Sequence, residues 1–369
     1  MPTVKSRLNW TAEPWSGQEP LECAMVVPET PDTATFTFRA PSGAWFDYQP
    51  GQFVTLDLPV DPKKGAGGNV QRTYTISSSP SRPLSISVTV KAQPGSIGTR
   101  WMLDHLKPGM RIKAFGPAGI FSFHRHPARK HLFISAGSGI TPMMSMTTWA
   151  WDSGEMPDIV FVHAARRPSD LIFRERLEQF ANRVPGLQLR FTVEEPDPFR
   201  AWPGYHGRLS QIMLGLMAPD YLEREVFCCG PEPFMQAVRE MLVSLGYDME
   251  HYHQESFGAP VSTEAEAPVI EDIAPEEGAG AEISFTGPGA GSGVSLRCAE
   301  TDTVLAVARR AGLNIPSGCT FGLCGTCRTR KVSGEVHMVH NGGISDEDIE
   351  EGWILACCSN PLGKVVVEV

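Results

Sequence analysis

Three cysteines near the carboxyl end are spaced C-x4-C-x2-C, and this run constrains the chain more than any other feature. They are Cys319, Cys324 and Cys327, and a fourth cysteine, Cys357, lies in a separate downstream segment. This is the plant-type spacing of the four thiolates that hold a [2Fe-2S] cluster. Glycines within the run let the backbone turn tightly around inorganic sulfides. The sequence therefore predicts that these four cysteines ligate a [2Fe-2S] cluster.

Two other uses of cysteine fit this pattern less well. Structural zinc sites pair two short Cys/His knuckles, whereas the distant segment offers the adjacent pair Cys357 and Cys358. A disulfide framework is typical of small secreted chains, and this chain has 369 residues and nine cysteines, an odd number. The remaining cysteines are irregularly spaced, which favours free thiols in a reducing cytoplasm.

Composition excludes some classes of partner. The net charge of -10 argues against nucleic acid, whose phosphates recruit basic surfaces. The amino terminus has basic residues but no apolar run after them, so we expect no signal peptide. Residues 132–151 lack charge, yet their interior contains Gly, Ser, Thr and Pro in turn-forming order. We therefore expect strand, loop and helix there, and no membrane span.

The pattern of residues divides the chain into five parts. We expect a loose arm over residues 1–20. Residues 21–128 hold short alternating strands separated by turn signals, which predicts an antiparallel β-barrel. Residues 129–257 alternate apolar strands with helical stretches, which predicts an α/β domain with a parallel sheet covered on both faces. Residues 258–280 are acidic without basic residues and predict a flexible linker, and residues 281–369 predict a small α+β (β-grasp) ferredoxin domain.

Two motifs in the barrel segment suit a flavin nucleotide. In the run Arg-Thr-Tyr-Thr, Arg72 and Tyr74 alternate with their neighbours and so share a face of a strand. Arginine offers a fork for phosphate, and tyrosine offers a flat ring. Gly98 and Thr99 lie at the start of a predicted helix through Leu106, where backbone N–H groups suit a pyrophosphate. A plain surface strand and an N-capped helix are the structural alternatives.

A glycine-rich turn lies between a predicted strand and helix in the α/β segment. Its sequence is Gly-Ser-Gly-Ile-Thr-Pro, from Gly137 to Pro142. Thr141 is expected to cap the helix and Pro142 to occupy its first position. Gly137 and Gly139 would let a dinucleotide phosphate approach the backbone. An ordinary turn remains the alternative, because the full G-x-G-x-x-G pattern is absent.

Two further candidates follow predicted parallel strands, at the edge where such sheets bind ligands. Cys229, Gly230 and Pro231 follow an apolar strand that is expected to end at Cys228. The alternative is a pair of buried cysteines, which we expect to hold for one of the two. Arg166 follows the second parallel strand and suits either a 2′-phosphate or the adenine and ribose of a coenzyme.

Taken in order, these motifs resemble those of the ferredoxin–NADP reductase superfamily. With the C-terminal cysteine pattern, the chain resembles oxygenase reductases, most closely those of glycine betaine monooxygenase (demethylase) systems. The resemblance covers about residues 21–257 and 281–369. It implies an NAD(P)H-dependent oxidoreductase that passes electrons from NADH to FAD, then to [2Fe-2S], then to a Rieske-type oxygenase that demethylates a quaternary amine such as glycine betaine.

The resemblance also implies roles for the flavin-side residues. Arg72 would hold a flavin phosphate, and Tyr74 would stack on the isoalloxazine. Thr75 would hydrogen-bond near flavin N5, where hydride arrives; many relatives have Ser there, and the hydroxyl is kept. Gly98 and Thr99 would bind the pyrophosphate.

On the coenzyme side, the run from Gly137 to Pro142 would bind the NAD(P)H pyrophosphate, and Cys229 would lie near the nicotinamide carbon that gives up hydride. Phe257 would cover the other face of the flavin. Glu255 would serve as a proton relay, although a surface salt bridge is the favoured interpretation.

Several alternatives stay open. NADH is preferred over NADPH, and FAD over FMN. The electron acceptor could instead be a hybrid-cluster protein or a diiron oxygenase. A redox-sensing iron–sulfur flavoprotein would need a nucleic-acid or signalling surface, and no basic helix is evident. His251 and His253 flank Tyr252, but further metal ligands are not in view, so we interpret them as packing residues.

Overall fold

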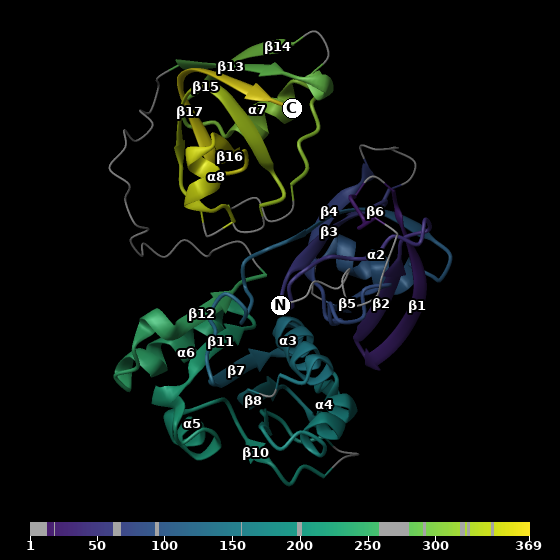
Figure 1. Ribbon diagram of the computed structural model, residues 1–369, viewed down its shortest axis with the longest axis vertical. Coiled ribbons are helices and arrows are strands. Elements are labelled where there is room, and N and C mark those ends of the chain that lie inside the picture. The colour runs from purple at the N-terminus through teal and green to yellow at the C-terminus, as the bar shows by residue number, and fades with distance from the viewer. Residues whose placement is uncertain are drawn as a thin grey trace. The chain divides into compact units, whose positions relative to one another are not determined.

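The computed structural model describes residues 13–17, 19–61, 68–92, 96–155, 157–197, 201–257, 280–290, 293–317, 322, 325–340 and 343–369. They fall into two compact units, Met1–Gly258 and Ala259–Val369 (Figure 1). The predicted linker at 258–280 lies outside the described residues except for Gly280, which begins a strand.

The first sheet of the larger unit is antiparallel and has six strands in the order β4-β3-β6-β1-β2-β5. Their bounds are β1 (Leu21–Thr30), β2 (Thr33–Arg39), β3 (Phe53–Leu58), β4 (Val70–Thr75), β5 (Ile86–Lys91) and β6 (Arg111–Ala118). An isolated bridge between Ile76 and Val88 joins the end of β4 to β5, so the sheet closes on itself. Helix α2 (Ile97–His105) packs on its core through Met102. The antiparallel barrel predicted from strand alternation is confirmed.

Part of the N-terminal arm is packed, contrary to the expectation of a loose segment. Trp15 is buried, and its backbone N–H donates to the carbonyl of Trp45 at 2.8 Å. The Trp15 ring lies 5.6 Å from that of Phe46, measured between centroids. A large indole buried in this way gains free energy from the apolar area that it removes from water. Residues 1–12 lie outside the described part of the chain.

The second sheet of the larger unit is wholly parallel, in the order β10-β9-β8-β7-β11-β12. Its strands are β7 (Lys130–Ala136), β8 (Asp158–Ala165), β9 (Leu187–Val193), β10 (Tyr205–His206), β11 (Glu225–Cys229) and β12 (Tyr252–Glu255). The connecting helices are α3 (Ile140–Ser153), α4 (Arg174–Ala181), α5 (Gln211–Met217) and α6 (Glu232–Ser244). Strands that alternate with helices produce this arrangement because parallel neighbours need a crossover.

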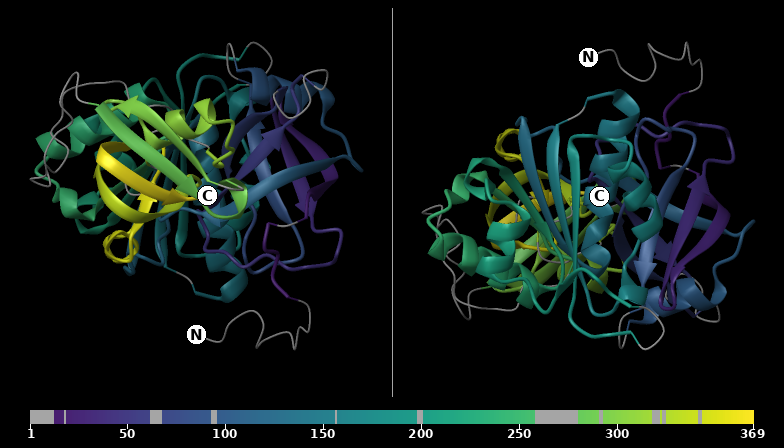
Figure 2. Two further views of the ribbon diagram at one scale, coloured as in Figure 1. Left: turned by 90° about the horizontal axis from the view of Figure 1, so that it is seen from above. Right: turned by 90° about the horizontal axis from the view of Figure 1, so that it is seen from below.

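Alternate strand residues build a core on each face of the parallel sheet, and helices lie on both faces (Figure 2). One core contains Phe133, Phe161 and Phe227 with side chains of α3 and α4. The other contains Val160 and Val226 with side chains of α5 and α6. The uncharged stretch at 132–151 is therefore a strand, a turn and a helix. Among the described residues, no helix is long and apolar enough to cross a membrane.

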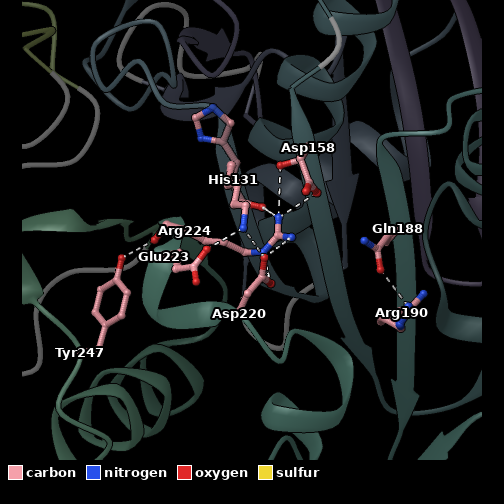
Figure 3. Close-up of polar contacts among 9 residues, drawn as sticks. His131, Asp158, Gln188, Arg190, Asp220, Glu223, Arg224 and Tyr247 are labelled. Atoms are coloured by element: carbon pink, nitrogen blue, oxygen red, sulfur yellow. Dashed lines mark hydrogen bonds and ion pairs between the residues drawn. The ribbon is translucent and has the colours of Figure 1, made fainter.

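A buried arginine fixes the amino end of β11 (Figure 3). The side chain of Arg224 is 2% exposed and pairs with Asp220 at 2.7 Å and Asp158 at 3.0 Å. Its guanidinium also donates to the carbonyl of His131, and the Tyr247 hydroxyl donates to the Arg224 carbonyl at 2.7 Å. A buried guanidinium is tolerated only with such complete pairing. The network ties the start of β11 to β7 and β8.

The smaller unit has a mixed five-stranded sheet in the order β14-β13-β17-β15-β16, in which only β13 and β17 are parallel. Its elements are β13 (Gly280–Thr286), β14 (Val294–Ala299), α7 (Val304–Arg310), β15 (Arg328–Met338), α8 (Asp346–Glu350), β16 (Trp353–Leu355) and β17 (Ser359–Glu368). Helix α7 packs its apolar face on the sheet through Val304 and Val307. This is the predicted α+β domain.

Candidate functional site

The end of strand β4 presents a cation and a buried phenol. Arg72 is exposed and makes no ion pair among the described residues; its guanidinium donates to the carbonyl of Gln71 at 2.8 Å. The Tyr74 hydroxyl is buried without a hydrogen-bond partner in the described part of the chain. Burial raises the pKa of Tyr74 to about 12, and the nearby Thr99 hydroxyl offsets part of this rise. A buried hydroxyl with no partner is rare in proteins, so this one is suited to a ligand.

The first turn of α2 lies against Arg72. A Cβ at Gly98 would come within 2.9 Å of Arg72 Cγ and 3.2 Å of Leu58 Cδ1, so only glycine fits without displacement. Ser96 caps the helix, because its side chain accepts a hydrogen bond from the Thr99 N–H. A guanidinium beside backbone N–H groups at a helix start is an anion-binding arrangement and fits the phosphates of a flavin nucleotide.

Glu255 is buried, and the expected surface salt bridge is wrong. It is 5% exposed and accepts a 3.2 Å hydrogen bond from Thr75 Oγ1, with no ion pair among the described residues. Burial raises the pKa of Glu255 to about 8, and the bond from Thr75 lowers it in part. The reason is the unpredicted strand β12, which carries Glu255 into the sheet.

Cys229 lies directly opposite Glu255, because the two residues pair in the parallel register of β11 and β12. Burial raises the pKa of the Cys229 thiol well above its usual value, and the nearby Glu255 carboxylate raises it further. The thiol is therefore neutral at physiological pH. Cys228 and Cys229 are both fully buried, in the cores on opposite faces of the sheet, so burial holds for both cysteines and not for one alone. Thr75, Cys229 and Glu255 thus come together from three strands.

Two contacts hold the barrel against the parallel sheet. Arg82 forms a bidentate pair with Asp152 of α3, with both distances at 2.8 Å. Ser145, also in α3, donates to the carbonyl of Ser78 at 2.6 Å. Both barrel residues follow β4, so these contacts help to hold Thr75 next to β12. Sequence analysis missed them, because nothing local marks a long-range pair.

The glycine-rich turn packs against the end of β11. A Cβ at Gly139 would lie 2.1 Å from the carbonyl oxygen of Cys229, so glycine alone allows this approach. Gly137 has a left-handed φ of +54°, and a Cβ there would meet nothing within 4 Å. A Cβ at Gly230 would come within 2.9 Å of the Phe234 ring. The turn thus leaves room for a ligand at Gly137 and is closed at Gly139.

The predicted cap of α3 is wrong. The helix begins at Ile140 with Gly139 as the N-cap, so Thr141 and Pro142 are its second and third residues. Thr141 Oγ1 donates to the Ser138 carbonyl at 3.0 Å and does not accept from the backbone. The shift arises because a 3-10 turn over Gly137–Gly139 runs directly into the helix.

Three other candidate site residues follow strands of the parallel sheet, at its carboxyl end. Pro231 is the N-cap residue of α6. Arg166 follows β8 and is exposed, and its carbonyl accepts from the Glu195 N–H at 2.8 Å. Phe257 follows β12 and is 43% exposed. An exposed phenylalanine next to a buried polar site leaves a ring face available for a ligand.

Two of the four predicted cluster cysteines are described, and both are buried. The Cys357 N–H donates to Cys327 Sγ at 3.4 Å, and the Gly322 N–H donates to Cys357 Sγ at 3.3 Å. No disulfide is found among the described cysteines. Backbone N–H groups aimed at sulfur stabilise thiolates, which fits an iron–sulfur cluster. Cys319 and Cys324 lie outside the described residues.

The cysteine loop depends on two glycines. Gly322 and Gly325 have left-handed φ values of +75° and +66°. A Cβ at Gly322 would lie 2.8 Å from Cys358 Sγ, and one at Gly325 would lie 2.7 Å from the Gly343 carbonyl oxygen. Both the conformation and the space therefore require glycine.

Family models match three segments of the chain. They are an oxidoreductase FAD-binding domain at 24–123, an oxidoreductase NAD-binding domain at 133–240 and a 2Fe-2S iron-sulfur cluster binding domain at 290–362. These matches confirm the predicted cofactors FAD, NAD and [2Fe-2S], and they make the chain an NAD(P)H-dependent oxidoreductase.

Curated relatives match nearly the whole chain. The stachydrine N-demethylase reductase subunit of Rhizobium meliloti (strain 1021) is 63% identical over 96% of this chain and 97% of the relative. The glycine betaine monooxygenase reductase subunit of Pseudomonas aeruginosa (strain UCBPP-PA14) is 46% identical over 97% of each. Among solved structures, phthalate dioxygenase reductase shares the fold, with a TM-score of 0.59, 22% identity and coverage of 96% of this chain and 100% of that one. The chain therefore belongs to the ferredoxin–NADP reductase superfamily, among the oxygenase reductases that carry a C-terminal [2Fe-2S] domain.

Proposed function

We propose that this chain takes hydride from NADH and delivers single electrons to a Rieske-type oxygenase that demethylates a quaternary amine. The observation that supports the reductase step is the meeting of three strand ends at one buried place: Thr75 of β4, Cys229 of β11 and Glu255 of β12. Parallel sheets bind ligands at this edge. The substrate class of the partner is supported by the relatives, one named for stachydrine and the other for glycine betaine.

The cofactors supply the electron chemistry. Bound FAD converts a two-electron hydride into single electrons, which a [2Fe-2S] cluster carries onward. The chain's own residues bind and orient. Arg72 and the start of α2, with Gly98 and Thr99, hold the flavin phosphates. Tyr74 would pack against the isoalloxazine, and Phe257 would cover its other face.

Thr75 and Glu255 handle the proton at the reacting edge. With its pKa raised to about 8, the buried Glu255 holds a proton at neutral pH. A group whose pKa lies near the working pH serves well as a general acid or base. The proton resides on the Glu255 carboxyl, within hydrogen-bond reach of Thr75 Oγ1. The neutral, buried Cys229 thiol would lie beside the nicotinamide and help to exclude water there.

The coenzyme is held by the turn after β7. Gly137 leaves room for its pyrophosphate next to the first residues of α3, which include Thr141 and Pro142, and Gly139 lets the turn pack against the end of β11. Gly230 and Pro231 would border the nicotinamide, and Arg166 would contact the adenosine. NADH is proposed over NADPH. The comparison of kcat/KM for the two coenzymes tests this choice, and a higher value for NADPH would overturn it.

The [2Fe-2S] cluster is held by Cys319, Cys324, Cys327 and Cys357. This ligand set is supported by the plant-type spacing and by the two backbone N–H groups that point at Cys327 and Cys357. We place the protein in the cytoplasm, where such thiols stay reduced.

An anaerobic absorbance spectrum of the purified full chain tests the reductase assignment. We expect flavin and iron–sulfur bands that both bleach on addition of NADH. Analysis of the released flavin should find FAD. Zinc in place of iron and acid-labile sulfide would refute the cluster, and bands unchanged by NADH would refute the reductase.

Reconstitution tests the partner and its substrate. The reductase is mixed with a Rieske-type oxygenase, NADH, oxygen and either stachydrine or glycine betaine, and formaldehyde is measured. Oxidative demethylation uses one oxygen molecule and two electrons per methyl group and yields formaldehyde and water. We expect formaldehyde only when reductase, oxygenase and amine are all present. NADH oxidation without formaldehyde for both amines would overturn the proposed substrate class.

A further inference from the structure

Three side chains at the amino end of β11 and β12 bring metal-ligand atoms together. His126 comes from the segment between β6 and β7, Glu225 begins β11, and His253 lies in β12. One potential ligand atom from each residue lies within 4.8 Å of those of the other two. All three side chains are half-buried. Of these three residues, the sequence pattern drew attention only to His253, together with His251. His126 and Glu225 are distant from them in the chain.

The carboxylate of Glu225 organises the cluster. Its Oε1 lies 2.6 Å from His253 Nε2, and its Oε2 lies 3.0 Å from His251 Nδ1. The His126 ring stacks on that of His253, with centroids 3.5 Å apart and planes at 22°. Ion pairing accounts for the contacts of Glu225, whereas His126 is held by ring packing, on His253 and edge-on to Phe227 with centroids 6.0 Å apart. The His126 ring makes no hydrogen bond among the described residues.

The backbone beneath the cluster is held rigidly. Glu225 follows Arg224, whose buried network ties the start of β11 to β7 and β8 (Figure 3). His253 is paired with Phe227 in the parallel ladder. Metal sites bind well when their ligands come from fixed strands, since less order must be created on binding. His126 lies in a connecting segment, where its ring is able to turn about the Cβ–Cγ bond.

We propose that His126, Glu225 and His253 form a site for a divalent transition-metal cation. Two imidazoles and one carboxylate are a ligand set that suits Zn²⁺, with further positions for water or for His251. To bind one ion, the two stacked rings would turn so that a nitrogen lone pair of each points at it. The site lies four residues along β11 from Cys229, roughly 13 Å at the usual rise of a strand. It therefore lies away from the proposed hydride site.

A cation here would join three separate segments. β12 has four residues and, among the described strands, pairs with β11 alone at the edge of the sheet. A metal bound by Glu225 and His253 would link the two strands, and His126 would attach the segment that leads from the barrel. We therefore assign the site a stabilising role, with no part in electron transfer.

Zinc titration of the full-length holoprotein tests the site. Zinc is titrated anaerobically against a chromogenic chelator, and the thermal midpoint is recorded with and without zinc. Wild type should take up about one zinc per chain and unfold a few degrees higher. Glu225→Gln and His126→Gln should weaken uptake by about tenfold or more and lose the shift. His206→Gln, an exposed histidine on β10, is the matched control and should behave as wild type.

Iron and acid-labile sulfide are counted before and after each titration, so that zinc that displaces the cluster is not scored as binding. Flavin content and NADH-driven flavin reduction show that each variant is folded. His126→Gln remains informative if Glu225→Gln fails to fold, because it changes only the connecting segment. The proposal is overturned if wild type shows no saturable uptake, or if both variants bind zinc as wild type does.

Discussion

The hydroxyl of Thr75 donates a 3.2 Å hydrogen bond to the carboxyl group of Glu255, although 180 residues separate them in the chain. Thr75 ends β4 of the barrel, and Glu255 ends β12 at the edge of the parallel sheet. Both side chains are buried. The contact brings a barrel strand to the carboxyl end of the sheet, next to Cys229, and thus joins the two halves of the larger unit at the proposed reacting edge.

The buried Glu255 should make stability depend on pH. Burial raises its pKa from an ordinary value of 4.5 to about 8, so between these values the folded protein holds a proton that the unfolded chain releases. The contribution of Glu255 to the free energy of unfolding is therefore greatest below pH 4.5. It falls as pH rises toward 8, by up to about 1.4 kcal/mol per pH unit. Glu255→Gln keeps the shape without ionising. Its thermal midpoint should gain on wild type steadily between pH 5 and pH 8.

Glu250→Gln, a change at an exposed position, is the matched control. Its midpoint should track wild type across the same range. Parallel curves for wild type and Glu255→Gln would show that Glu255 does not take up a proton on folding.

The Thr75 hydroxyl should be needed for hydride transfer. Thr75→Ser keeps the hydroxyl, and we expect NADH-driven flavin reduction within about threefold of wild type. Thr75→Val keeps the shape but leaves the buried Glu255 without its bond, at a cost of about 1–3 kcal/mol. We expect flavin reduction to slow by about tenfold or more, as for other lost acid–base contacts. Anaerobic stopped-flow measurement compares the two, and equal rates would remove the hydroxyl from the mechanism.

The strands that sequence predicts are those with clear alternation. β2 and β3 alternate apolar and polar residues in sequence, although the fold buries nearly every one of their side chains, Thr35 and Thr55 included. β1 has a half-exposed, irregular pattern and contains a proline, so no period marks it. β12 is Tyr-His-Gln-Glu, four mostly polar residues that only pairing with β11 identifies as a strand. β1 and β12 are strands because they pair with other strands in the fold, and the local sequence pattern does not reveal that pairing.

The candidate site likewise contains residues that local sequence spacing marks and residues that only the fold brings together. Glycines and cysteines marked by spacing were found from sequence, because spacing is local. The burial of Glu255 was not, since it follows from β12. The cluster around Glu225 was not found either, because His126 and His253 reach it only through the fold. The expected cap at Thr141 was wrong, since a 3-10 turn begins the helix earlier than a cap rule places it.

Gly139→Ala should damage coenzyme binding. The new Cβ would lie 2.1 Å from the Cys229 carbonyl oxygen, so the backbone must move. Overpacking of this kind costs about 1–3 kcal/mol. We expect a lower thermal midpoint and a KM for NADH raised severalfold. Gly215→Ala is the control, because a Cβ there, within α5, meets nothing within 4 Å. It should be neutral or stabilise by up to about 1 kcal/mol. Equal effects would show that the turn is not tightly packed.

Cys327→Ala should separate flavin reduction from electron delivery. The change removes a proposed cluster ligand and the sulfur that accepts the Cys357 N–H. We expect iron and acid-labile sulfide to be lost, with NADH-driven flavin reduction kept, because the flavin and coenzyme sites lie in the other unit. Delivery to the oxygenase should fall by about tenfold or more. Cys298→Ala, in β14, is the control and should keep its iron and its delivery. A Cys327→Ala protein that retains both would show that this sulfur holds no iron, and the electron path proposed for the chain would need another carrier.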